Sequence, residues 1–161
     1  MDRAQQGAQD DDVVSLRPYP EAELEAMWAD SESRYFGDLV GNGGLAEDEA
    51  RAKAAKDTVW LRGLDPLLFE IEHEGARVGR VVLWLDAFEQ PGKAWLFDIV
   101  LDPAVRGRGL GREALRLAEA EARTRGMTRI DLNVFAGNAV ARSLYASEGY
   151  AESSVHMGKP L

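Results

Sequence analysis

The sequence contains no cysteine, and that absence excludes several kinds of chemistry at once. Without a thiol the chain cannot form a disulfide, hold zinc through sulfur or carry an acyl group on a cysteine. Histidine is scarce as well, since only His73 and His156 are present and neither has partners at metal-ligand spacing. We therefore expect both histidines to be structural or surface residues, and no metal site. No Gly-x-Ser-x-Gly motif occurs, so a serine hydrolase is not supported either.

Long apolar runs and excess positive charge are also missing. No stretch approaches the roughly 18 apolar residues of a membrane span, so no membrane association is expected. The net charge of −9 argues against nucleic acid as a partner, because that affinity depends on many lysines and arginines. Residues 1–12 are polar and acidic, which predicts a frayed tail and not a secretory signal. The expected location is cytoplasmic.

The composition that is present is that of a globular protein. With 161 residues, 45% of them hydrophobic, the chain is long enough for one domain with a proper core, which we place at residues 13–161. Apolar periodicity and turn residues predict strands at 13–16, 67–73, 77–85, 95–101, 130–134 and 150–159, and helices at 21–40, 47–61, 110–125 and 138–147. Strands 95–101 and 130–134 flank a helix and should run parallel. The expected fold class is α/β (α+β), with a mixed sheet.

The most informative stretch is 98–112, where a strand ends at Asp102-Pro103 and a glycine-rich loop leads directly into a helix. The free N–H groups and positive dipole of a helix N-terminus bind phosphate oxygens. Glycines let the backbone approach these oxygens closely, and arginines add charge from the sides. The residues expected to take part are Arg106, Gly107, Arg108, Gly109, Leu110, Gly111 and Arg112. The alternative is a solvated glycine turn before an amphipathic helix.

The spacing of the glycines narrows the choice of phosphate ligand. The dinucleotide pattern Gly-x-Gly-x-x-Gly fails, because Arg112 stands where the third glycine is needed. The Gly-Lys-Ser/Thr ending of a P-loop is absent too. A nucleotide-binding domain of either kind is therefore disfavoured. The pattern that does occur is Arg-x-x-Gly-x-Gly at 106–111.

A second motif follows downstream, with Asn138 after the strand, then Leu144-Tyr145 and Gly149-Tyr150. Together the two motifs resemble the Gcn5-related N-acetyltransferase (GNAT) superfamily, strongly over about residues 78–150 and more weakly elsewhere. The resemblance implies a GNAT fold with about six to seven strands and four helices, in which two parallel strands splay apart and hold coenzyme A. The pantetheine arm would then bond to the backbone of Ile99, Val100 and Leu101.

The resemblance also implies an activity, the transfer of an acetyl group from acetyl-coenzyme A to a primary amine. The acceptor would be a small molecule or a protein, transfer would be direct within a ternary complex, and homodimers occur in the family. A non-catalytic module that binds or senses acetyl-coenzyme A is the alternative. In the family the tyrosine at the place of Tyr145 protonates the departing thiolate.

The other site residues can be assessed from their positions. Asn138 can cap a helix and face the cofactor, and it lies seven residues before Tyr145, so both side chains share one helix face about 10 Å apart. Asp98 is a candidate general base, although it could equally hold a helix or an arginine, and Glu70 is another candidate. Two aromatic residues of the first helical region could line the acceptor pocket or belong to the core; they are Trp28 and Tyr35.

Overall fold

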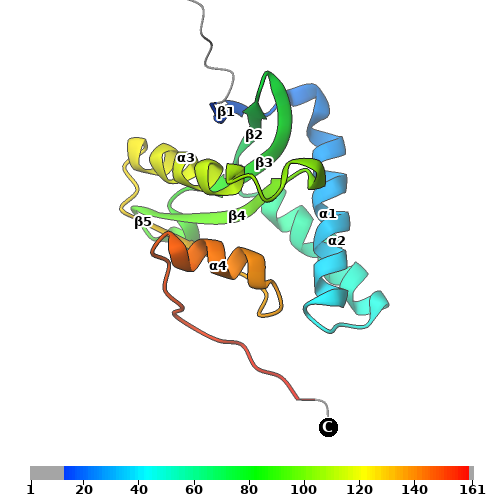
Figure 1. Cartoon of the computed structure of the whole chain (residues 1–161). Coiled ribbons are helices and arrows are strands. Elements are labelled where there is room, and N and C mark those ends of the chain that lie inside the picture. The colour runs from blue at the N-terminus through cyan, green and yellow to red at the C-terminus, as the bar shows by residue number, and fades with distance from the viewer. Residues whose placement is uncertain (1–12, 160–161) are drawn as a thin grey trace, which may run out of the picture.

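The computed structural model describes residues 13–159 and shows one mixed sheet with helices on both faces (Figure 1). The tail expected at residues 1–12 lies outside the described residues. The strand order is β1-β2-β3-β4-β5, with antiparallel neighbours except for β4 and β5, which are parallel. The strands are β1 (Ser15–Pro18), β2 (Leu67–His73), β3 (Ala76–Trp84), β4 (Lys93–Leu101) and β5 (Arg129–Leu132). The mixed sheet predicted from the sequence is confirmed.

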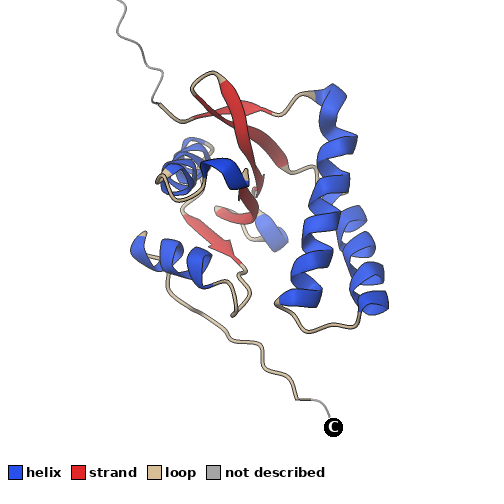
Figure 2. Ribbon diagram, turned by 45° about the vertical axis from the view of Figure 1, so that its right-hand side comes forward, coloured by secondary structure: helices blue, strands red, loops and turns tan. Residues whose placement is uncertain are grey.

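The helices divide between the two faces of the sheet. Helices α1 (Leu24–Gly41) and α2 (Glu47–Arg62) stand side by side on one face (Figure 2), where Trp28 packs close to Val82 of β3. Helix α3 (Leu110–Thr124) covers the other face, and α4 (Ala139–Ser147) packs against the same core cluster. Each face therefore has its own apolar core.

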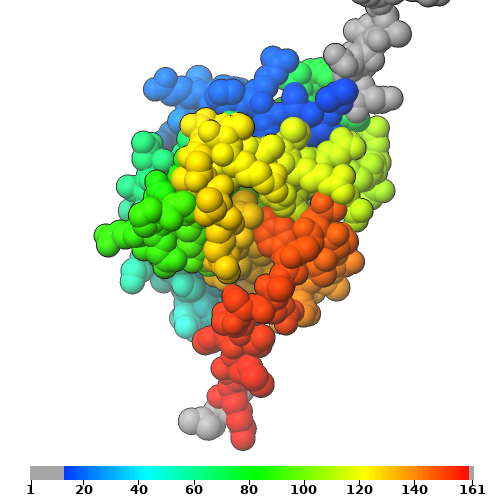
Figure 3. All heavy atoms as spheres, turned by 90° about the vertical axis from the view of Figure 1, so that its left-hand side faces the viewer, coloured from blue at the N-terminus to red at the C-terminus, as the bar shows by residue number. Residues whose placement is uncertain are grey.

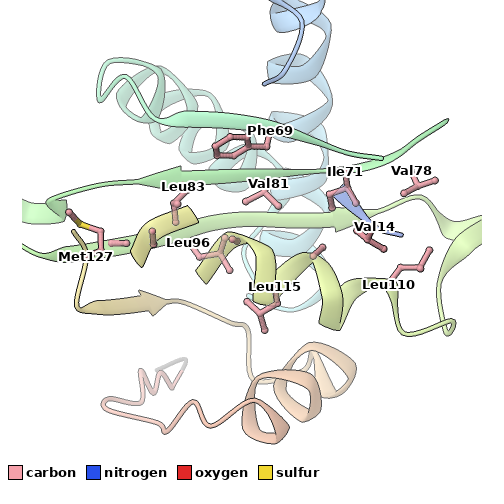
Figure 4. Packing of buried hydrophobic residues seen from close by; sticks show 14 residues of the cluster. Val14, Phe69, Ile71, Val78, Val81, Leu83, Leu96, Leu110, Leu115 and Met127 are labelled. Carbon is pink, nitrogen blue, oxygen red and sulfur yellow. The ribbon is translucent and has the colours of Figure 1, made fainter. Parts of the chain in front are cut away.

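The core beneath α3 follows directly from the amphipathic pattern of the helix. Its buried residues are Leu110, Ala114, Leu115, Ala118 and Ala122, which recur every three or four positions. They meet the alternate residues of the strands that point to this face, including Ile71, Val81 and Leu83 (Figure 4). Small alanines on the helix let it approach the sheet closely.

Ile71 is completely buried in this core, so the loss of one methylene group from it should be measurable. We expect Ile71→Val to lower the free energy of unfolding by about 0.5–1.5 kcal/mol without changing cofactor affinity. Urea unfolding followed by circular dichroism would measure the change. A variant as stable as the parent protein would contradict the tight packing of this cluster.

The hairpin between β2 and β3 is another prediction that the structure confirms. Glu74 and Gly75 form a two-residue turn, and both have positive φ angles, 53° and 73°. Two left-handed central residues are characteristic of the type I′ turn, whose twist matches that of the flanking strands. The turn thus fixes the register of the hairpin that supports one wall of the site.

The expected strand at 150–159 is wrong, and so is the count of six to seven strands, because the described residues form five. Residues 151–159 are exposed and project from the body, as the red segment of Figure 3 shows. A strand requires a neighbour for its backbone groups, and here the segment lies along no other strand. The first strand also begins at Ser15 and not at residue 13, and the first helix starts with a 3₁₀ turn at Glu21–Glu23.

Candidate active site

Strands β4 and β5 separate partway along their length. They pair only between Lys93–Leu96 and Arg129–Leu132, whereas β4 continues to Leu101. Within the described residues, the side of β4 that faces β5 therefore has no strand partner at 97–101. In this stretch the backbone groups of Ile99 and the N–H group of Leu101 face the gap and are available to an extended ligand. The backbone of Val100, which was expected to take part as well, faces the other way and pairs with Arg80 of β3.

The separation begins at an irregularity in β4. Val82 of β3 pairs with Asp98, but the next residue, Leu83, pairs with Leu96, so that Phe97 is an extra residue. Such a bulge bends a strand and increases its twist. The bend comes directly after the last residue that pairs with β5, and it explains why the two parallel strands diverge there.

The glycine loop lies at the open end of this gap. After a short 3₁₀ turn, η4 (Pro103–Val105), the chain passes through Gly107 and Gly109 with φ angles of 76° and 86°, and α3 then begins. In the described part of the chain the backbone N–H groups of residues 107–111 have no hydrogen-bond acceptor. A Cβ atom at either glycine would meet nothing within 4 Å. The loop therefore presents donors and open space to an anion.

Two arginines of the loop are held by neighbouring elements. Arg106 donates a hydrogen bond from Nε to the carbonyl oxygen of Leu101 at 2.9 Å. Arg108 contacts the buried ring of His73 at 3.4 Å and lies 3.7 Å from the Glu74 carboxylate. Both interactions fix the loop to the ends of strands, and they give His73 a structural role.

Two arginines of α3, Arg112 and Arg116, connect this helix to α4. Arg112 donates to the hydroxyl of Ser147 at 3.0 Å and lies 3.3 Å from the carboxylate of Glu148. Arg116 forms a second ion pair with Glu148 at 2.7 Å. Hydrogen bonding to Arg116 is the main cause that lowers the pKa of Glu148 below its ordinary value. These contacts hold α4, and with it Tyr145, beside the start of α3.

Tyr145 lies on the inner side of α4, partly buried and 5.6 Å from the ring of Tyr150. Its hydroxyl has no hydrogen-bond partner among residues 13–159. Burial, and secondly the negative charge of Asp98, raise the pKa of Tyr145 to about 12. The phenol is therefore protonated at neutral pH, and it lies close enough to Asp98 for the carboxylate charge to affect its pKa.

Asn138 occupies the N-cap of α4, where its Oδ1 accepts a hydrogen bond from the backbone N–H of Ala141 at 3.1 Å. This is the capping role expected from the sequence. The side chain is exposed, and its amide group makes no other hydrogen bond within the described residues. Capping thus leaves the amide donors of Asn138 available to a ligand.

Asp98 projects from the bulged part of β4 and is 27% exposed. Its Oδ2 accepts a hydrogen bond from Nε of Arg80 at 3.0 Å. Burial raises the pKa of Asp98 above its ordinary value, although the Arg80 guanidinium acts in the opposite direction. Asp98 thus makes the contact with an arginine that was its alternative role. Its raised pKa also means that the carboxylate has an increased affinity for a proton.

Glu70 is less well placed than Asp98. It lies on β2, which β3 separates from β4, and it forms an ion pair with Arg77 at 2.8 Å. Arg77 also binds Glu23 at 2.7 Å. These ion pairs connect β2 and β3 to the segment before α1. The structure therefore does not bring Glu70 to the gap between β4 and β5.

A groove of about 350 Å³ lies between α1 and the ends of β3 and β4. Its wall includes Tyr19, Glu23, Met27, Asp30, Arg34, Arg77, Gly79, Arg80, Val100 and Asp102. Neither aromatic residue considered for the acceptor pocket lines it, because Trp28 is core and the hydroxyl of Tyr35 bonds to Asp57 at 3.0 Å.

Arg80 and Asp30 were not among the site residues predicted from the sequence. Arg80 had one available signal, a charged residue in an otherwise apolar strand next to Val81 and Val82. A buried charge requires a partner, so its position predicts a carboxylate nearby. Nothing in the local sequence of α1 indicates that Asp30 is that partner.

The model of the acetyltransferase (GNAT) family matches residues 17–150. The chain belongs to this family. This GNAT protein is an acyltransferase of the N-acetyltransferase class, and it is 30% identical over 155 residues to the uncharacterized N-acetyltransferase YdgE of Bacillus subtilis, covering 92% of this chain and 99% of YdgE.

Two further relatives extend the comparison of this GNAT chain. The crystal structure of the putative acetyltransferase YycN from Bacillus subtilis has a TM-score of 0.82 at 25% identity and covers 92% of this chain and 99% of that one. The mycothiol acetyltransferase of Beutenbergia cavernae is 29% identical over 143 residues, which are 88% of this chain but 46% of that protein. The GNAT fold predicted from the two motifs is confirmed, with the smaller number of strands described above.

None of the helices within residues 13–159 of this GNAT chain combines the length and the apolar character that crossing a bilayer requires.

Proposed function

We propose that this protein transfers the acetyl group of acetyl-coenzyme A directly to a primary amine within a ternary complex. The proposal rests on the gap between β4 and β5, which ends at the N–H groups of residues 107–111, groups that have no acceptor within residues 13–159. An extended pantetheine arm matches the free edge of β4, and a pyrophosphate matches the N-terminus of α3. Membership of the acetyltransferase family supports the same cosubstrate.

The residues present fit this cosubstrate. The backbone of Ile99 and the N–H group of Leu101 would bond to the pantetheine amides, and the loop from Arg106 to Arg112 would hold the phosphates. The open space at Gly107 and Gly109 accommodates phosphate oxygens without displacing protein atoms. Bound acetyl-coenzyme A supplies the thioester whose carbonyl carbon the amine attacks.

The two proton transfers are assigned to Asp98 and Tyr145. Asp98 accepts a proton from the acceptor ammonium, directly or through water, which leaves the amine with a free lone pair. Tyr145 then donates its phenolic proton to the departing thiolate, and the second N–H proton that the nitrogen loses on becoming an amide restores the phenol. Since the charge of Asp98 raises the pKa of Tyr145, protonation of Asp98 lowers that pKa again and makes Tyr145 a better donor. The two groups are thus coupled in the productive direction.

The acceptor is a primary amine of a small molecule or of a protein. One relative is named for a small molecule, mycothiol, which supports the first of these two classes. The groove beside Val100 is the proposed place for the acceptor, and it presents both acidic and basic side chains. The cytoplasmic location and the homodimer remain predictions.

An acceptor screen tests this function. Acetyl-coenzyme A would be incubated with n-butylamine, glucosamine, a peptide with a free N-terminal amine and a peptide whose one amine is a lysine side chain. n-Butanol serves as the matched hydroxyl control. We expect mass spectrometry to show acetylated amines with equimolar release of coenzyme A, and no ester.

Two other results would contradict the proposal. Exclusive formation of butyl acetate would show that the acceptor is a hydroxyl group. Tight binding of acetyl-coenzyme A in calorimetry, with no product from any amine, would favour the non-catalytic sensing module instead.

A further inference from the structure

Arg80 lies in the middle of β3 and connects two carboxylates from different elements. Only 8% of the residue is exposed. Its Nε donates to Asp98 on β4 at 3.0 Å, and its Nη1 donates to Asp30 on α1 at 2.6 Å. One buried guanidinium therefore joins the first turns of α1 to the bulged part of β4.

The contacts of this guanidinium are incomplete. Its Nη2 is buried and has no hydrogen-bond partner within residues 13–159. A buried donor without a partner is costly, and native structures keep few of them. Both carboxylates bond to Arg80 through Oδ2 alone, so Oδ1 of each makes no hydrogen bond to the guanidinium. The guanidinium can thus be shared unequally between Asp98 and Asp30.

The two carboxylates differ in their surroundings. Asp30 is 50% exposed in the wall of the groove and also accepts a hydrogen bond from Arg34 at 2.8 Å. Burial raises the pKa of Asp30 somewhat, but the hydrogen bonds from Arg80 and Arg34 more than offset this and hold it below the ordinary value. For Asp98 burial prevails and the pKa is raised. Asp98 is thus the carboxylate suited to accept a proton, and Asp30 the one that stays ionised.

The charged and titratable groups facing Asp98 come from three elements. They are Arg80 of β3, Asp30 and Arg34 of α1, and Tyr145 of α4. The arginines favour the ionised carboxylate, whereas Asp30 disfavours it through like-charge repulsion. Removal of Arg80 should therefore raise the pKa of Asp98, whereas removal of Asp30 should lower it.

We propose that Arg80 is a positioning residue that orients the Asp98 carboxylate for proton transfer, and that Asp30 competes for the same guanidinium. The inference rests on the proposed function, in which an N–H bond of the acceptor ammonium breaks and an O–H bond forms on Asp98. Once Asp98 is neutral, Arg80 keeps Asp30 as its ionised partner. The buried guanidinium is therefore never left unpaired, which would otherwise oppose the proton transfer.

The pH dependence of kcat/KM tests the proposal, with acetyl-coenzyme A and the panel amine that is acetylated fastest. Activity should rise with pH as Asp98 ionises, so the acid limb reports its pKa. For Arg80→Met we expect this limb to move to higher pH by about 1–3 units, because an opposite charge is lost. For Asp30→Asn we expect it to move to lower pH by about half a unit. Arg80→Lys, which keeps the charge, should retain the parent limb with a lower kcat.

Asp38→Asn is the matched control. It makes the same change of charge two turns further along α1, where Asp38 bonds to Asn42 and not to Arg80, so its acid limb should be that of the parent. Arg80→Met can fail to fold, but Asp30→Asn alters a half-exposed side chain and keeps the proposal testable. An acid limb that Asp30→Asn leaves unchanged, or moves to higher pH, would overturn the proposal.

The variant Asp98→Asn separates this inference from the function on which it rests. If Asp98→Asn keeps the parent rate and acid limb, Asp98 is not the base and the function proposed for it fails. If Asp98→Asn removes the limb but neither Arg80→Met nor Asp30→Asn moves it, only the role of Arg80 fails.

Discussion

Replacing Tyr145 with phenylalanine should lower kcat about 10²- to 10⁴-fold while acetyl-coenzyme A binds almost as tightly as before. The phenol is protonated at neutral pH, with a pKa of about 12, and its hydroxyl bonds to no other group in the described residues. The hydroxyl therefore contributes little to the stability of the free protein, and its loss mainly slows the step in which the thiolate departs. Steady-state kinetics with calorimetric measurement of cofactor affinity would show the difference.

Tyr150→Phe provides the matched control for this experiment. Tyr150 lies 5.6 Å from Tyr145 between ring centres, and its hydroxyl donates to Glu119 at 3.1 Å. Its loss should cost about 1 kcal/mol of stability through the missing hydrogen bond and leave kcat unchanged. Chemistry in single turnovers of the Tyr145→Phe enzyme as fast as in the parent would defeat the assignment and leave water as the proton donor. A rise in KM with kcat unchanged would mean that Tyr145 only holds the cofactor.

The second large effect is expected at the phosphate loop. Gly109→Val should weaken the binding of coenzyme A about 100-fold, which corresponds to the loss of two charge-assisted hydrogen bonds worth about 1.5 kcal/mol each. Gly109 has a φ of 86°, and no protein atom lies within 4 Å of the place its Cβ would take. The valine side chain would therefore occupy space that the phosphates require, and its backbone preference would turn the N–H groups away. Isothermal titration calorimetry with coenzyme A measures the change directly.

Gly126→Val separates strain in the backbone from loss of the anion site. Gly126 follows α3 with a φ of 84°, and it too has open space at its Cβ position. The substitution carries the same left-handed strain of about 1–2 kcal/mol but lies at the opposite end of the helix from the loop. Affinity should stay at the parent value in Gly126→Val. Equal losses of affinity in both variants, or none in Gly109→Val, would remove the loop from the binding site.

Local sequence patterns were sufficient for most of the secondary structure and for the family. The apolar spacing of α3, the Glu74-Gly75 turn and the glycine loop are each written in a few consecutive residues, because helix faces, turns and left-handed backbone depend on local chemistry. The same holds for Asn138, whose N-cap is a contact within three residues. The roles of Tyr145 and Asp98 remain predictions, supported by the raised pKa of each group and by the effect of the Asp98 charge on the pKa of Tyr145.

Other features were decided by contacts between distant parts of the chain. The segment 150–159 has a strand-like composition, but a strand needs a neighbouring backbone, and residues 151–159 are exposed without one. The bulge at Phe97 depends on the register between β3 and β4, which no local pattern of β4 reveals.

The charged network around the gap is likewise a tertiary property. Asp30, Arg80 and Asp98 are separated by 50 and 18 residues along the chain, and they meet because α1 packs on the face of the sheet to which Arg80 points. The glycine loop and the Asn/Tyr motif of an acetyltransferase can be recognised in the primary structure without any knowledge of the fold. The charges that surround the candidate base cannot, because burial and charge proximity, which set the proton affinity of a carboxylate, exist only in the folded chain.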